Sequence, residues 1–262
     1  METEALDLKK AKLVFTGGGT AGLVLPNLAI AKTFEAKLAD SMSEGMIELS
    51  YIGSKEGLER KLVEQSSSPW SYYPIYSGRL RRFFTLRNLL TPLFVMIGFF
   101  QAKKILKKLN PQVLFSKGGF VSAPVVWAAW WLNIPVVIHE SDLSPGLTTK
   151  LSVPFCKKIF LAFEDTVNSL SLSHLKKAET IGIPLRQELF ETEKESAISH
   201  FMLDQNKQTI LVFGGSLGAK VLNENFAAII NDLIDSFNII HIVGKGKAFE
   251  CDSSVSYKQF EY

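Results

Sequence analysis

Residues 11–16 read AKLVFT and residues 17–22 read GGGTAG, and these twelve positions decide the fold that the sequence predicts. The first stretch is short, apolar and rich in β-forming residues, which predicts a buried strand. The second is a glycine loop. Apolar residues at helical spacing follow over residues 26–39, and residues 47–52 predict another strand. This order of strand, glycine loop, helix and strand is one βαβ unit.

The same order recurs late in the chain. Residues 209–213 predict a strand, residues 214–219 (GGSLGA) form a second glycine loop, residues 223–234 predict a helix and residues 237–243 a strand. Two such units favour two α/β domains in tandem over a single sheet.

A domain boundary is expected near Gly182, after a run of short polar residues. The chain then divides into an N-terminal domain of residues 1–181 and a C-terminal part of residues 182–262. A Rossmann-like half usually needs about 100–150 residues. We therefore expect the second domain to be incomplete, with a C-terminal portion missing.

Three further strand-like runs lie between the two units, at residues 113–115, 135–139 and 159–162. In an open parallel sheet the carboxyl ends of the strands line the binding crevice. Residues 116–119 and 139–142 follow two of these runs, so we expect them to face the same crevice as the first glycine loop. His139, beside Glu140, is a site candidate, and a structural histidine is the equal alternative.

The composition is that of a globular chain. Of the 262 residues, 47% are hydrophobic and 21% are charged, which suffices for a packed core. Cys156 and Cys251 lie far apart and form no disulfide or metal-ligand pattern. The N-terminus lacks the apolar segment of a secretory signal, and the longest apolar run, Leu89–Phe100, is too short to span a bilayer. These features predict a cytosolic or peripheral protein.

The charge is unevenly distributed. Between Glu64 and Glu140 there is no Asp or Glu, and nine basic residues lie there: Arg79, Arg81, Arg82, Arg87, Lys103, Lys104, Lys107, Lys108 and Lys117. Cationic side chains that flank an apolar run suit the surface of an anionic membrane. A core helix with a solvated basic face is the alternative. Nucleic acid is disfavoured because no nucleic-acid-binding motif occurs.

The two glycine loops are candidate phosphate sites, because N–H groups without a neighbouring Cβ can approach a phosphate at a helix N-terminus. Glycines that only form tight turns are the alternative. A nicotinamide-dependent oxidoreductase would need an acidic residue at the end of the second strand, where Gly53-Ser54-Lys55 stands. Neither a P-loop nor an Asp-x-Asp metal clamp occurs. Two loops in two domains suit an enzyme with two phosphate-bearing substrates.

Segments spread along the chain also match, in order, the motifs of one known family. These are residues 18–26 (GGTAGLVLP), 116–124 (SKGGFVSAP), 139–148 (HESDLSPGLT), 182–186 (GIPLR) and 214–223 (GGSLGAKVLN). On these segments the chain resembles the undecaprenyldiphospho-muramoylpentapeptide β-N-acetylglucosaminyltransferases, the MurG family.

The resemblance implies an α/β fold of GT-B type, with two Rossmann-like domains of which the second is incomplete here. It implies inverting transfer of N-acetylglucosamine from UDP-N-acetylglucosamine to lipid I, the undecaprenyl-pyrophosphoryl-MurNAc-pentapeptide, giving lipid II for peptidoglycan. No metal or other cofactor is implied. The implied location is peripheral, at the cytoplasmic face of the bacterial inner membrane, with the Arg79–Lys108 region against its anionic surface.

By motif position, the resemblance also implies the site residues. The implied substrate-binding residues are Thr20, Ala21, Gly22, Asp142, Arg186 and Ser216, and the implied phosphate-loop residues are Gly18, Gly19, Gly214 and Gly215. The hydroxyl of Ser216 is suited to donate to a pyrophosphate oxygen.

The chain departs from the family pattern at two points. Leu23 stands where the family has a histidine, and leucine can neither accept a proton nor form a hydrogen bond. The family's downstream segments, which bind the uridine and the sugar, are missing. We therefore expect this polypeptide to be weakly active or inactive unless a separate chain supplies the rest. The alternative is a non-catalytic remnant that binds lipid I or a cell-division partner.

Overall fold

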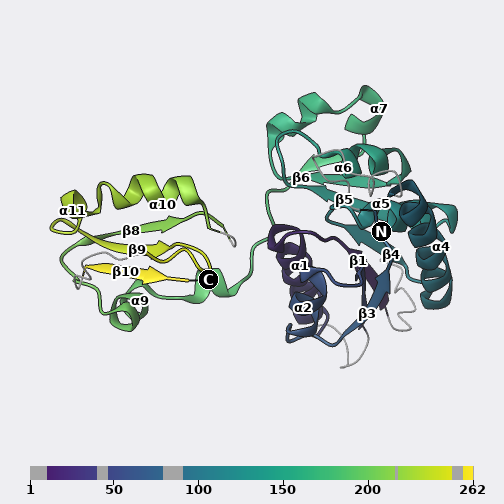
Figure 1. The fold of residues 1–262 in the computed structure, drawn as a ribbon. Helices are drawn as coiled ribbons and strands as arrows, with labels where there is room; N and C mark the ends of the chain where they lie inside the picture. Colours follow the sequence, from purple (N-terminus) through teal and green to yellow (C-terminus); the bar gives the residue numbers. More distant parts are fainter. Residues whose placement is uncertain (1–10, 40–46, 79–90, 216–217, 250–255, 262) are drawn as a thin grey trace. The chain divides into compact units, whose positions relative to one another are not determined.

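A computed structural model describes residues 11–39, 47–78, 91–215, 218–249 and 256–261 (Figure 1). The chain forms two compact units, Met1–Arg186 (unit 1) and Gln187–Tyr262 (unit 2). The division falls a few residues after the expected boundary at residue 182.

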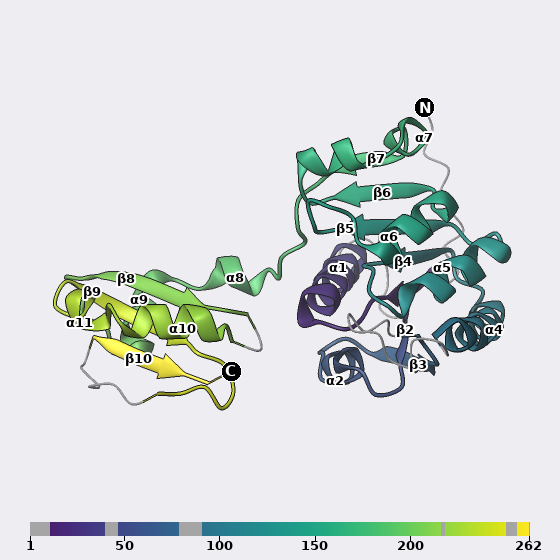
Figure 2. The ribbon, with the colours of Figure 1, turned by 45° about the horizontal axis from the view of Figure 1, so that its top comes forward.

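Unit 1 is built on a seven-stranded sheet in the order β3-β2-β1-β4-β5-β6-β7, and every neighbouring pair is parallel (Figure 2). The strands are β1 Ala11–Thr16, β2 Ile47–Ser54, β3 Trp70–Ile75, β4 Val113–Ser116, β5 Val136–Glu140, β6 Lys158–Leu161 and β7 Ala178–Thr180. The strand order reverses between β1 and β4. This is the topological switch point at which open parallel sheets bind their ligands.

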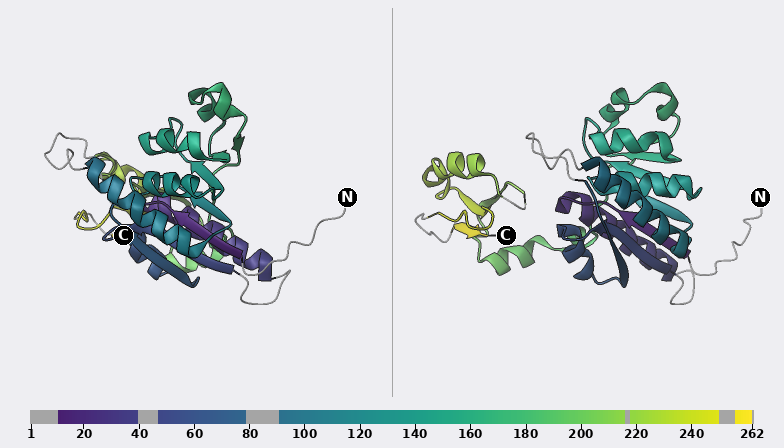
Figure 3. Two further views of the ribbon diagram at one scale, coloured as in Figure 1. Left: turned by 90° about the vertical axis from the view of Figure 1, so that its right-hand side faces the viewer. Right: turned by 45° about the vertical axis from the view of Figure 1, so that its right-hand side comes forward.

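Helices cover both faces of this sheet. They are α1 Ala21–Ala39, α2 Leu58–Glu64, α4 Thr91–Leu109, α5 Ser122–Trp131, α6 Leu147–Ser152 and α7 Leu172–Leu175, with 3-10 turns η1 Val153–Phe155 and η2 Glu164–Ser169. The alternation of side chains along β1 assigns the faces: Val14 packs in one core with Leu106 of α4, and Phe15 packs in the other with Val24 of α1. Figure 3 shows α4 beside α5 in the first of these layers.

Unit 2 contains a three-stranded parallel sheet in the order β10-β9-β8. Its elements are α8 Glu188–Glu191, α9 Lys194–Phe201, β8 Gln208–Phe213, α10 Lys220–Ala227, α11 Ile230–Leu233, β9 Phe237–Ile242 and β10 Tyr257–Phe260. The single helix predicted over residues 223–234 was wrong, because the chain breaks into α10 and α11. The break directs Ile230 into the core, where it packs with Ile239, and leaves Ile229 46% exposed.

Candidate functional site

The carboxyl ends of the central strands bring the predicted loops of unit 1 together. Thr16 of β1 pairs with Ser116 of β4, and Ser116 pairs with Ile138 of β5. The segments that follow these strands therefore leave the sheet at one edge. The expectation that residues 116–119 share this edge with the first glycine loop is confirmed, since the N–H of Gly18 donates to the carbonyl of Gly118 at 3.3 Å.

Two glycines make the closest contact of this edge. A Cβ on Gly119 would lie 2.1 Å from the carbonyl oxygen of Gly18, far inside van der Waals contact. Gly119 also has φ +87°, in the left-handed region that favours glycine. The loop after β4 therefore packs directly on the loop after β1, with no room for a side chain between them.

The helix after the first glycine loop begins at Ala21, five residues before the predicted start at residue 26. The prediction rested on the helical spacing of apolar residues from Pro26 onward, but α1 starts earlier and Pro26 lies inside it. Ala21, Gly22 and Leu23 consequently form the first turn. The N–H groups at the start of a helix lie at its positive end, which suits an anion. The N–H of Leu23 already donates to the carbonyl of Thr20 at 3.1 Å, so those of Ala21 and Gly22 are the candidates.

Buried side chains that the sequence alone did not single out fix the first glycine loop by hydrogen bonds. The hydroxyl of Tyr51 on β2 donates to the carbonyl of Gly17 at 2.9 Å, and Asn27 of α1 donates to the Tyr51 oxygen at 3.1 Å. Burial raises the pKa of Tyr51 well above its ordinary value, so the hydroxyl stays protonated and able to donate.

A cavity of about 470 Å³ in unit 2 and one of about 510 Å³ in unit 1 lie beside the two glycine loops. The unit 1 cavity is lined by Gly19, Ser54, Lys55, Glu56, Gly57, Leu58, Glu59, Ile75, Tyr76, Ser77 and Phe120. Two of the lining side chains form a cation–π contact, in which the Lys55 Nζ lies 3.8 Å from the centroid of the Tyr76 ring.

His139, at the end of β5, has a structural contact. Its Nε2 lies 2.8 Å from the carbonyl oxygen of Gly182, so Nε2 carries the proton and donates. The ring is 0% exposed, and its Nδ1 has no hydrogen-bond partner within the described part of the chain. Burial, assisted by the nearby charge of Lys117, lowers the pKa of His139 to about 4. The imidazole is therefore neutral at pH 7.

This burial predicts acid sensitivity of unit 1. The folded pKa of His139 lies below its ordinary value of 6.5, so the unfolded chain binds the proton first as the pH falls. The contribution of His139 to the free energy of unfolding is then fully present above about pH 6.5. It decreases as the pH falls toward 4, by about 3 kcal/mol in total.

All four tryptophans lie in unit 1, so tryptophan fluorescence during urea unfolding at pH 7 and pH 5 measures this unit. A His139→Gln variant, whose amide nitrogen can take the place of the histidine Nε2 and donate to Gly182, should lose this part of the slope. An unchanged slope would show that His139 is not its source.

The carboxylate of Glu140 organises the loop that follows β5. It accepts the N–H groups of Ser141 at 2.7 Å, Asp142 at 2.9 Å and Gly146 at 3.3 Å. The side chain of Asp142 is left exposed. Lys117, which is 2% exposed, donates from Nζ to the hydroxyl of Ser141, and burial lowers the pKa of Lys117 to about 8. Lys117 thereby joins the loop after β4 to the loop after β5.

In unit 2, the second glycine loop packs on the turn after β9. A Cβ on Gly218, which has φ +66°, would lie 2.0 Å from the carbonyl oxygen of Val243. Asn223 of α10 donates to that same carbonyl at 2.9 Å, and its Oδ1 lies 3.2 Å from Nε2 of the buried His241. Unit 2 therefore repeats the arrangement of unit 1, in which two loops at the carboxyl edge touch through glycine.

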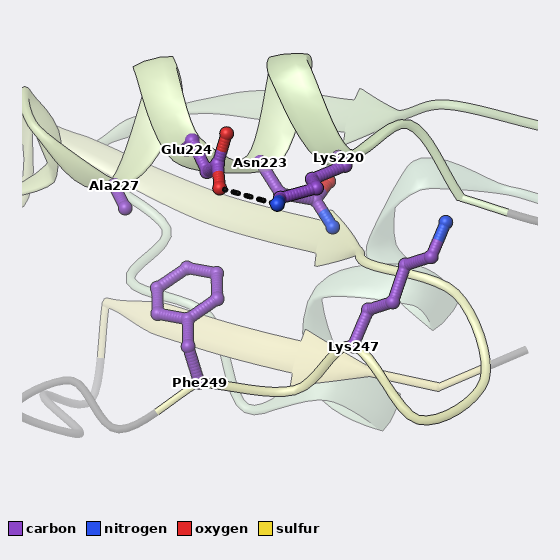
Figure 4. A pocket seen from close by; sticks show the side chains of 6 residues that line it. All are labelled: Lys220, Asn223, Glu224, Ala227, Lys247 and Phe249. Carbon is purple, nitrogen blue, oxygen red and sulfur yellow. Dashed lines mark ion pairs between the residues drawn. The ribbon is translucent and has the colours of Figure 1, made fainter.

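The unit 2 cavity opens on the flank of α10, beside this loop. Figure 4 shows Lys247 and Phe249, which follow β9, across from the side chains of α10. The complete lining is Lys220, Asn223, Glu224, Ala227, Lys247 and Phe249. The Nζ of Lys247 donates to the carbonyl of Gly218 at 2.9 Å, and Lys220 pairs with Glu224 at 3.5 Å.

The remaining predicted site residues lie at the surface of their units or outside the described residues. Thr20 and Gly22 are exposed at the start of α1, and Arg186 is exposed as the last residue of unit 1. Ser216 and the Arg79–Arg87 part of the basic region lie outside the described residues. No group of His, Cys, Asp or Glu side chains able to hold a metal ion occurs among those described. Likewise, no described helix has the length and apolarity needed to cross a membrane.

The arrangement defines a class of protein. Two parallel-sheet units, each with a glycine loop at the carboxyl edge of its first central strand, form the GT-B fold of glycosyltransferases and related enzymes. Residues 13–161 match the glycosyltransferase family 28 N-terminal domain, and residues 209–262 match the glycosyltransferase family 28 C-terminal domain. The chain belongs to glycosyltransferase family 28.

Curated relatives make this assignment more specific. The UDP-N-acetylglucosamine--N-acetylmuramyl-(pentapeptide) pyrophosphoryl-undecaprenol N-acetylglucosamine transferase of Clostridium botulinum is 44% identical, over 96% of this chain and 68% of the relative. The protein of the same name from Clostridium perfringens is 42% identical over 97% of this chain and 68% of its own length. The chain thus spans about two thirds of the length of these relatives.

Solved structures agree on the fold. The crystal structure of Acinetobacter baumannii MurG aligns with a TM-score of 0.63 at 24% identity, over 96% of this chain and 66% of that one. A UDP-GlcNAc 2-epimerase from Neisseria meningitidis, bound to UDP-GlcNAc, aligns with a TM-score of 0.62 at 14% identity, over 96% and 72%.

Proposed function

We propose that this chain is a UDP-N-acetylglucosamine-dependent hexosyltransferase that transfers N-acetylglucosamine to lipid I in peptidoglycan synthesis. The observation that carries the proposal is the 44% identity with a relative named for this transfer, over 96% of the chain. The glycine loops agree with it, because a nucleotide sugar and a lipid-linked diphosphate are both phosphate-bearing substrates.

We assign the acceptor to unit 1 and the donor to unit 2. In unit 1 the first turn of α1 offers N–H groups to an anion, and the adjoining cavity is large enough for a sugar. In unit 2 the loop that contains Gly215 and Gly218 precedes α10 in the same way. In this assignment the hydroxyl oxygen of the acceptor sugar bonds to the anomeric carbon of the donor and its proton is lost to solvent. The bond from that carbon to the phosphate oxygen breaks, and the N–H groups of unit 2 stabilise the charge on the departing UDP.

Isothermal titration calorimetry with UDP-N-acetylglucosamine tests the donor half of this proposal. The 262-residue chain spans 68% of the Clostridium botulinum relative, so we expect it to bind this ligand more weakly than the relative does. We expect Gly218→Ala to lose the binding, because the added methyl would lie 2.0 Å from the Val243 carbonyl oxygen. GDP-mannose serves as the ligand control, and the Clostridium botulinum relative as the positive control. Heat from the relative and none from this chain would count against a donor site in unit 2.

We further propose that α4 places unit 1 on an anionic membrane surface. One face of α4 buries Gly98, Ala102 and Leu106 against the sheet. The opposite face exposes a continuous stripe of Leu93, Met96, Phe100, Lys104 and Lys107, which is apolar first and cationic afterwards. Trp131 of α5 adjoins the stripe, with the Lys103 Nζ 4.8 Å from its ring centroid. Such a surface can insert apolar side chains among lipids while its lysines contact the headgroups.

Vesicle sedimentation tests the membrane proposal. We expect the chain to sediment with vesicles that contain phosphatidylglycerol and to stay in solution with phosphatidylcholine alone. The Lys104→Glu/Lys107→Glu variant should weaken this binding, whereas Lys150→Glu, at an exposed position of α6, should not. Equal binding to both vesicle types would contradict an electrostatic contribution by α4.

A further inference from the structure

Glu59 is a buried carboxylate at the first glycine loop. It stands in the first turn of α2 and is 0% exposed. Its Oε1 accepts the backbone N–H of Ser54 at 3.0 Å and also the Ser54 hydroxyl. Its Oε2 accepts the N–H of Gly19 at 3.4 Å. A single side chain therefore connects the end of β2 to the glycine loop after β1.

The surrounding glycines leave space for this carboxylate. A Cβ on Gly57 would lie 2.2 Å from the Cδ of Glu59, and one on Gly18 would lie 2.8 Å from the same atom. On Gly53 it would lie 3.0 Å from the Glu59 Cγ. A methyl group at Gly57 or Gly18 would displace the carboxylate, so the local sequence is fitted to its presence.

Burial of the Glu59 carboxylate costs free energy that a side chain needed only for packing would not cost. A buried carboxylate loses its hydration and must be compensated by donors or by a cation. Among the residues that the structure describes, no lysine or arginine forms an ion pair with Glu59. Its compensation comes from two backbone N–H groups and one hydroxyl. An apolar side chain of similar size would avoid this cost.

Glu59 lies where its carboxylate can fix the glycine loop beside the unit 1 cavity. It lines the 510 Å³ cavity together with Gly19 and Ser54. It also accepts the N–H of Gly19. Gly19 has no side chain to restrict its backbone, and it adopts a φ of +103°. Two residues further on, α1 begins and presents its first-turn N–H groups. The orientation of those groups therefore depends on where Glu59 holds Gly19.

We propose that Glu59 is a positioning residue of the unit 1 site. Its carboxylate holds residues 17–20 and the start of α1 in the conformation that receives the acceptor. The identity of that acceptor rests on the function proposed above, whereas the control of the loop by Glu59 does not.

The Glu59→Gln variant separates this role from simple filling of space. Glutamine has the same size, and its Oε1 can still accept both donors of Ser54. Its NH₂ group then faces the N–H of Gly19, donor against donor. The matched control is Glu64→Gln on the same helix, where an exposed carboxylate pairs with Arg60 at 2.8 Å.

Hydrogen exchange measured by mass spectrometry gives a readout that needs no activity. We expect amide exchange in the peptide that contains residues 17–20 to accelerate on the order of 10- to 100-fold in Glu59→Gln, the factor set by loss of one buried hydrogen bond. Glu64→Gln should exchange like the unaltered chain. Glu59→Asp, whose shorter carboxylate reaches Ser54 but not Gly19, should accelerate exchange as well, and it replaces Glu59→Gln if that variant does not fold.

Steady-state kinetics then distinguish a positioning role from a stabilising one. We expect Glu59→Gln to raise KM for a water-soluble lipid I analogue and to leave KM for UDP-N-acetylglucosamine unchanged. Unaltered exchange at residues 17–20 would overturn the proposal. So would faster exchange with both KM values unchanged in an active enzyme. If the unaltered chain transfers no sugar, the calorimetric titration with UDP-N-acetylglucosamine tests the proposed function, and the exchange data still decide whether Glu59 holds the loop.

Discussion

Replacing Leu23 by histidine is expected to raise the rate of sugar transfer by a factor on the order of 10² to 10⁴, the usual contribution of general acid–base catalysis. Leu23 lies in the first turn of α1 and is half-buried, and its N–H donates to the carbonyl of Thr20 at 3.1 Å. A histidine here would stand beside the glycine loop, next to the N–H groups assigned to the acceptor. Leucine offers neither a base nor a hydrogen bond at that place.

The gain would be measured with a coupled assay for released UDP, using the lipid I analogue as acceptor. Leu23→Gln is the matched control, because glutamine adds hydrogen-bonding groups without a base that titrates near neutral pH. A gain in the histidine variant alone assigns proton transfer to this position, and an equal gain in both assigns hydrogen bonding. No gain in either variant would contradict a role for position 23 in the rate, provided that tryptophan fluorescence shows both to be folded.

The Gly119→Ala variant is expected to destabilise unit 1 by about 2–4 kcal/mol, since it combines a steric overlap with a left-handed backbone conformation. The added methyl would lie 2.1 Å from the carbonyl oxygen of Gly18, and main-chain atoms cannot move aside as a flexible side chain can. The loops after β1 and β4 must separate, so acceptor binding should be lost together with stability.

Urea unfolding followed by tryptophan fluorescence measures this loss in unit 1. Gly146→Ala is the matched control, because a Cβ there would meet nothing within 4 Å and its φ of −64° suits alanine. We expect the control to change stability by no more than about 0.5 kcal/mol. Equal stabilities of the two variants would show that the loops can separate at no cost.

Local patterns in the sequence predicted the first strand of each sheet, because each is a short run rich in apolar and β-branched residues. The runs at residues 11–16 and 209–213 are rich in apolar residues, and both were placed within one residue. β1 is a central strand that is buried from Val14 to Thr16, whereas β8 is an edge strand that exposes Leu211 and Phe213. β3 was missed because Pro74 interrupts it. A proline is tolerated there because β3 lies at the edge of the sheet, where one side of the strand makes no ladder bonds.

The glycine loops were also predictable, but the side chains that hold them were not. Tyr51 reaches Gly17 from 34 positions away, and Glu59 reaches Gly19 from 40. Nothing in the spacing of a tyrosine on an apolar strand, or of a glutamate on a short charged helix, distinguishes it from its neighbours. Lys117 is a comparable case, because its burial depends on Ser141 and on the end of β5. Such contacts are set by tertiary structure, which a local pattern does not contain.

The last two residues of β5 support two segments that are distant in the sequence. His139 holds the backbone at Gly182, while Glu140 holds the loop from Ser141 to Gly146. Both contacts depend on the conformation of two consecutive residues at the end of β5. If that strand end opens, the loop and the segment at Gly182 lose their anchors in the same event. We therefore expect them to behave as one cooperative opening unit, with a single free energy of local unfolding.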